Sequence, residues 1–86
     1  MTYFIGGNSD SEQVSQNDLD QGSTRILKQF GSSNGMSRPS EIYERTKVSI
    51  NGDIKTFYII SGKHPKIFKE TIVRLWDEVE TEVYAL

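Results

Sequence analysis

The chain has 86 residues and a mass of 9.8 kDa, so it can hold one small domain that buries about 60% of its unfolded surface. It is 35% apolar and 26% charged and has no cysteine, which excludes disulfides, thiolate metal sites and a cysteine nucleophile. The net charge is −2, but positive and negative residues are unevenly distributed along the chain. A basic middle part (residues 23–74) lies between two acidic ends that carry no Lys or Arg.

Residues 1–22 are predicted to form a polar, flexible N-terminal segment. Between Gly6 and Thr24 the only apolar residues are Val14 and Leu19. Such a composition buries too little apolar surface to offset the entropy lost on ordering. Residues 2–5 are a strand candidate that ends at Gly6. The remaining residues, 23–86, are expected to form a single small domain with its core in residues 42–86.

Residues 23–30 are predicted to form a short helix. Ile26, Leu27 and Phe30 would lie on one side of it, and Gly31 follows at the position where helices commonly end. Residues 31–41 are rich in Gly and Ser and therefore predict a flexible loop.

Asn51-Gly52 predicts a β-hairpin with a two-residue turn, since both residues tolerate the positive φ that such a turn needs. Residues 42–50 and 53–61 have the composition of its two strands. In this register one face is the predicted core and carries Ile42, Val48, Ile50, Phe57 and Ile59. The opposite face is amphipathic and carries Tyr43, Arg45, Lys47, Ser49, Ile54, Thr56, Tyr58 and Ile60.

An amphipathic helix of about twenty residues is predicted to begin at Pro65, a residue suited to the first turn of a helix. Its apolar stripe comprises Phe68, Ile72, Leu75, Val79 and Leu86, widened by Trp76 and Val83. The predicted fold class is α+β, with the topology β-α-β-β-α. The alternative is a ββα core, an antiparallel hairpin packed by the C-terminal amphipathic helix, which completes itself by dimerising.

The sequence carries no pattern that indicates catalysis, a metal site or a cofactor. His64 is the only histidine, so no catalytic triad is indicated, and it is expected to be a turn residue. Asp18 and Asp20 begin like a calcium loop, but the glycine and glutamate that should follow are misplaced or missing. A weak anion site is predicted where three lysines surround the start of the helix: Lys63, Lys66 and Lys69.

The amphipathic hairpin face is the predicted partner-binding surface, since it interleaves rings and cations. Its residues are Tyr43, Arg45, Lys47 and Tyr58, joined by Trp76 of the helix. Alternatively, Arg45 and Tyr58 simply pair across the strands. We expect a small, non-enzymatic interaction or regulatory protein of the cytoplasm that binds a larger protein or forms a homodimer, without a membrane contact. The alternative function is a nucleic-acid-binding module that uses the same face.

Overall fold

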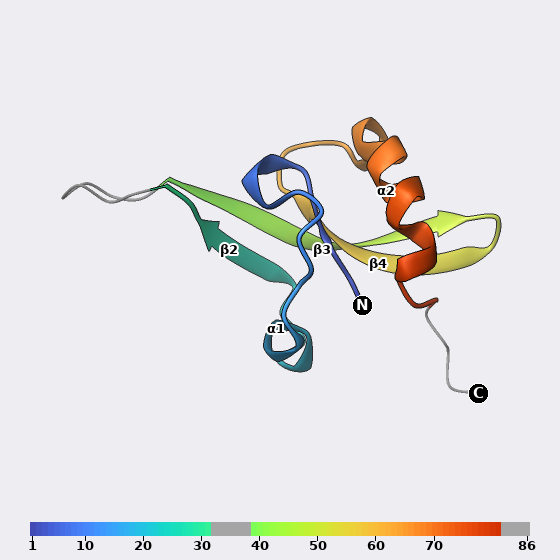
Figure 1. The fold of residues 1–86 in the computed structure, drawn as a ribbon, viewed down its shortest axis with the longest axis horizontal. Coiled ribbons are helices and arrows are strands. Elements are labelled where there is room, and N and C mark those ends of the chain that lie inside the picture. The colour runs from blue at the N-terminus through green and yellow to red at the C-terminus, as the bar shows by residue number, and fades with distance from the viewer. Residues whose placement is uncertain (32–38, 82–86) are drawn as a thin grey trace.

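The computed structural model describes residues 1–31 and 39–81. Its elements in chain order are β1 (Phe4–Ile5), the 3-10 helix η1 (Gly7–Ser9), α1 (Gln16–Asp20), β2 (Arg25–Gln29), β3 (Ser40–Ile50), β4 (Asp53–Ile60), η2 (Pro65–Phe68), α2 (Lys69–Leu75) and η3 (Trp76–Glu78). The strands form one four-stranded sheet in the order β1-β4-β3-β2. Figure 1 shows β2 at one end of the long strand β3 and the β3–β4 turn at its other end. No helix in the described ranges is long and apolar enough to cross a membrane.

The predicted hairpin and its register are confirmed. Asn51 and Gly52 have φ angles of 51° and 87°, as a turn with positive φ at both central residues requires. Ile50 pairs with Asp53, and the pairing continues without a slip to Tyr43 opposite Ile60. Alternate residues of the two strands therefore face opposite sides of the sheet, as the sequence indicates.

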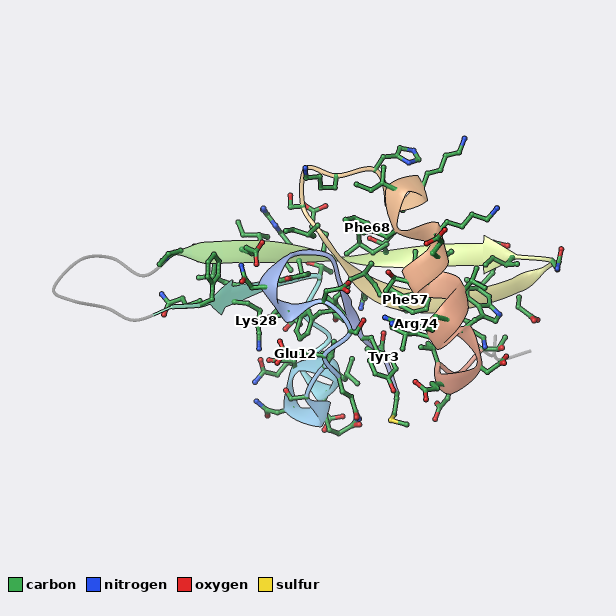
Figure 2. The ribbon with its side chains drawn as sticks, turned by 45° about the horizontal axis from the view of Figure 1, so that its top comes forward. Tyr3, Glu12, Lys28, Phe57, Phe68 and Arg74 are labelled. Atoms are coloured by element: carbon green, nitrogen blue, oxygen red, sulfur yellow. The ribbon has the colours of Figure 1, made fainter. Side chains whose placement is uncertain are left out.

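Helix α2 covers one side of the sheet, and the first apolar cluster lies beneath it (Figure 2). The cluster comprises Ile5, Phe57, Ile59, Ile72, Leu75 and Val79. The mixed α+β class and the helix start at Pro65 are confirmed, but the helix is shorter than predicted. It ends with η3 at Glu78, and Val79 is extended (ψ 134°) while still buried. Asp77 and Glu78 lie in this last turn, where acidic side chains oppose the helix dipole. Val83 and Leu86 lie outside the described residues.

The predicted helix over residues 23–30 is wrong, because this segment contains the edge strand β2. It pairs antiparallel with the first half of β3, from Arg25 opposite Glu44 to Gln29 opposite Ser40. Burial alternates as in a strand, since Ile26 is buried whereas Leu27 is exposed. The edge of β3 that faces away from β4 offers its backbone groups to this segment, and pairing in the sheet overrides the helical spacing. Of the expected loop, Ser40 and Glu41 belong to β3, and residues 32–38 are outside the described part of the chain.

Part of the polar N-terminal segment (residues 1–22) packs against the sheet, whereas α1 within it has no buried residue. The strand candidate over residues 2–5 becomes β1, which pairs in parallel with β4 through Phe4 opposite Tyr58. Phe4, Ile5 and Val14 are all buried. The segment reaches its neighbours because β4 has a free edge for β1 and because the second face of the sheet supplies large rings to cover.

Gly6 and Gly7 turn the chain out of β1. Their φ angles are 86° and 67°, a region that favours glycine. A Cβ atom on Gly6 would lie 2.7 Å from both Ile60 and Phe68. The close approach of this backbone to β4 and η2 therefore requires glycine at position 6.

The N-terminal segment also reaches α2 and η3 through polar side chains. Arg74 donates to the Ser11 hydroxyl at 2.8 Å, and the Tyr3 hydroxyl donates to Glu78 at 3.1 Å (Figure 2). Both hydrogen bonds are exposed to solvent. They fix where the segment meets the helix but contribute little to stability.

Candidate functional site

The two tyrosines of the predicted partner-binding face are buried, so neither ring is presented at the surface of the described chain. Tyr43 is 0% exposed and Tyr58 is 1% exposed. They belong to a second apolar cluster on the side of the sheet opposite α2, together with Phe4, Val14 and Ile26. The rings of Phe4 and Tyr43 meet edge to face, with centroids 4.8 Å apart. The N-terminal segment thus occupies the surface that the sequence left for a partner.

The hydroxyl groups of both tyrosines bond to backbone groups that lie over this side of the sheet. The Tyr43 hydroxyl donates to the Gly6 carbonyl at 2.7 Å and accepts from the Ser9 N–H at 3.2 Å. The Tyr58 hydroxyl donates to the Ser23 carbonyl. Burial raises the pKa of the Tyr43 phenol above its ordinary value, and the hydrogen bond from Ser9 opposes this shift. Each hydroxyl therefore satisfies a backbone group, Tyr43 within residues 1–22 and Tyr58 just after them, as buried tyrosines commonly do.

Tyr58 shares its surroundings with charged groups. Burial raises its pKa, the positive charge of Arg45 lowers it, and the negative charge of Asp18 raises it again. Arg45 stands directly opposite Tyr58 in the hairpin, and Lys47 stands opposite Thr56. Arg45 and Lys47 are exposed, so the cations of the predicted surface remain accessible while its rings do not.

Trp76 packs inside the molecule rather than presenting a free ring. It is partly buried and stacks on Phe57, with centroids 6.1 Å apart and planes 25° apart. The Lys55 ammonium lies 4.9 Å from the centre of the Trp76 ring and donates to the Trp76 carbonyl. Lys55 is buried, which sequence reasoning missed although the predicted register places it opposite Val48 on the core face.

A pocket of about 190 Å³ lies where the end of the β3–β4 hairpin meets the start of the helical segment. Its walls are apolar, since the lysines contribute the methylene parts of their side chains. The lining residues are Val48, Ile50, Pro65, Lys66, Lys69 and Ile72.

Two of the three lysines predicted to attract an anion therefore line one pocket. Lys66 and Lys69 are exposed residues, so their ammonium groups remain in water beside it. Lys63 is also exposed but does not line the pocket. His64 begins η2, and its Nδ1 accepts from the Lys66 N–H at 3.1 Å. This cap gives the single histidine a structural role in the turn, as expected.

An exposed valine extends the apolar surface beside the pocket. Val73 is 51% exposed and follows Lys69 by four residues in α2, so both lie on the same side of the helix. The arrangement offers an apolar hollow with two cations at its rim, which suits a ligand that is apolar at its tip and anionic beside it. Within residues 1–31 and 39–81, no three His, Asp or Glu side chains are placed to hold a metal ion.

Comparison of the chain with protein-family models, with curated proteins and with solved structures finds no match.

Proposed function

We propose that this chain is a small, non-enzymatic interaction protein that binds a segment of another protein in the pocket between β3 and the start of the helix. The observation that carries the proposal is the combination of an open, apolar pocket with the exposed amines of Lys66 and Lys69. In a chain of this size, an accessible hollow of this kind is a default candidate for a binding site.

The chemistry of the pocket selects the kind of segment. A cavity of about 150 Å³ can hold a benzene ring, so a pocket of about 190 Å³ has room for one aromatic or branched side chain. Carboxylates next to that side chain would meet Lys66 and Lys69. Residues 63–69 contain three lysines and no acid, so the surroundings favour an acidic partner.

Nucleic acid is the weaker candidate because its stacking surface is missing. Single-stranded binding by this face would need Tyr43 and Tyr58 as platforms for bases, and both rings are buried. The exposed cations Arg45 and Lys47 provide charge without rings.

The test is a titration followed by NMR with a blocked peptide in which phenylalanine stands between glutamates. We expect shifts of the Val48, Ile50 and Ile72 methyl groups, and loss of these shifts when alanine replaces the phenylalanine of the peptide. Joint reversal of Lys66 and Lys69 to Glu should weaken binding roughly tenfold, since exposed charge pairs contribute about 0.2–1 kcal/mol each.

Lys63→Glu is the matched control, because it reverses the same charge on an exposed lysine outside the pocket. It should weaken binding clearly less than the double reversal. Peptide-induced shifts confined to residues away from the pocket, or equal effects of the control and the double reversal, would contradict the proposal.

A further inference from the structure

The two edges of the sheet differ in whether other backbone groups of the chain cover them. The outer side of β1 is covered by the returning N-terminal segment. Phe4 N–H donates to the Glu12 carbonyl at 2.8 Å, Ser11 N–H donates to the Phe4 carbonyl at 2.7 Å, and Val14 N–H donates to the Thr2 carbonyl at 2.9 Å. This edge therefore cannot accept another strand.

The other edge, β2, is open on its outer side. The Thr24 carbonyl accepts from Arg45 N–H at 2.9 Å, so this residue points its backbone groups toward β3. Because backbone direction alternates along a strand, Ile26 and Lys28 also point toward β3. The groups of the intervening residues point outward, and these residues are Arg25, Leu27 and Gln29. No described residue pairs with the outer side of β2, and β2 contains no proline that would block pairing.

An apolar pair lies directly beside this open edge. Leu27 of β2 is 58% exposed. It stands opposite Ile42 of the adjacent strand β3, which is 37% exposed. Alternation along β3 places Ile42 on the same side of the sheet as Val48, the side that carries α2. The helix, however, covers the half of the sheet nearer the hairpin turn (Figure 1). The apolar pair thus adjoins an unpaired edge instead of lying under the helix.

We propose that β2 pairs antiparallel with β2 of a second copy of this chain, about a two-fold axis at Leu27, and so joins two sheets into one. Leu27 would stand opposite Leu27 of the other copy, with Arg25 opposite Gln29 and Ile26 opposite Lys28. The outward backbone groups of Arg25, Leu27 and Gln29 would then pair in full.

A second copy is the occupant because β2 is complementary to itself in this register. No two like charges stand opposite each other, and Leu27 with Ile42 forms an apolar strip continued by the same two residues of the other copy. The Lys28 charge does not repel the second copy at the proposed β2–β2 contact, because the Lys28 ammonium lies over the Phe4 ring of its own chain, 5.1 Å from the ring centre. The pocket lies at the other end of β3, so the dimer is independent of the proposed partner binding.

The native chain has no cysteine, so a single introduced cysteine reports the register directly. Hydrogen-bonded pairs in antiparallel strands have Cα atoms about 5.5 Å apart, within the range of about 4.4–6.8 Å that a disulfide spans. Leu27→Cys should therefore form a covalent dimer on mild oxidation. Gln29→Cys is the matched control on the same edge, because its two copies would lie about 14 Å apart along the strands.

The unmodified chain provides the second test. Analytical ultracentrifugation should give a mass near twice 9.8 kDa that falls to the monomer on dilution. Leu27→Lys should abolish the dimer, whereas Ile67→Lys should retain it, since Ile67 is 64% exposed but lies outside β2. A monomer at every concentration up to about 1 mM, or cross-linking of Gln29→Cys as fast as Leu27→Cys, would overturn the proposal.

Discussion

The two sides of the sheet are packed by different chemistry. The side under α2 is closed by aliphatic and aromatic side chains of an amphipathic helix, among them Ile72 and Leu75. The opposite side is covered by the N-terminal segment, which contributes Phe4 from β1 and Val14 beyond it. The backbone of this segment binds the Tyr43 hydroxyl at Gly6, and the Ser23 carbonyl just after the segment binds the Tyr58 hydroxyl. A polar segment can therefore join a core when the sheet supplies the rings and the segment supplies backbone partners.

The largest expected effect lies on the helix side. Leu75 is 8% exposed within the first cluster, so Leu75→Ala should lower the free energy of unfolding by about 2–5 kcal/mol, measured by chemical denaturation. Val73→Ala is the control in the same helix, because Val73 is 51% exposed and should change stability by no more than about 0.5 kcal/mol. Equal effects of the two truncations would show that α2 does not present this face to the sheet.

A smaller effect is expected on the tyrosine side. Tyr43→Phe keeps the ring but leaves the Gly6 carbonyl and the Ser9 N–H without their buried partner, which should cost about 1–3 kcal/mol. Tyr3→Phe removes a hydroxyl whose hydrogen bond to Glu78 is exposed, and should cost less than about 0.5 kcal/mol. If Tyr43→Phe is as mild as this control, the hydrogen bonds of the Tyr43 hydroxyl do not hold the N-terminal segment.

The smallest expected effect is an alkaline loss of stability that also comes from the tyrosine side. Burial raises the pKa of Tyr43 and Tyr58 in the native state, so the native state holds these protons more tightly than the unfolded chain does. The free energy of unfolding should be unaffected well below pH 10 and should fall as pH rises through about 10, the unfolded pKa, toward the native pKa values.

Denaturant titrations across this range would measure that slope. The double variant with Phe at positions 43 and 58 should show a shallower slope. An unchanged slope would show that these two phenols do not carry the alkaline effect.

The hairpin could be predicted residue by residue, whereas the strand β2 could not. Asn51-Gly52 sets a turn of known length, and the pairing of its flanks follows from that length alone. In residues 23–30, Ile26, Leu27 and Phe30 fit a helical spacing, and so short a run does not distinguish a helix from a strand. The pairing of Arg25 with Glu44 and its neighbours decided the outcome.

The candidate site was predicted in part. The lysine cluster at the helix start is visible in the sequence, and Lys66 and Lys69 do line a pocket. That Val48 and Ile50 leave an open hollow beside them depends on how the hairpin end sits against the helix. That Tyr43 and Tyr58 of the predicted partner surface are buried could not be predicted, because composition alone does not show that a polar segment covers those rings.

The sequence by itself determined the features that depend on neighbours along the chain: the turn at Asn51-Gly52, the alternation of its strands, and the start of the helix at Pro65. Only the tertiary structure decided which surfaces are covered. The Tyr43 hydroxyl meets Gly6 across 37 positions of the sequence, and Lys55 meets Trp76 across 21. Burial is a property of such distant contacts, so the local pattern shows which faces are apolar but not what covers them.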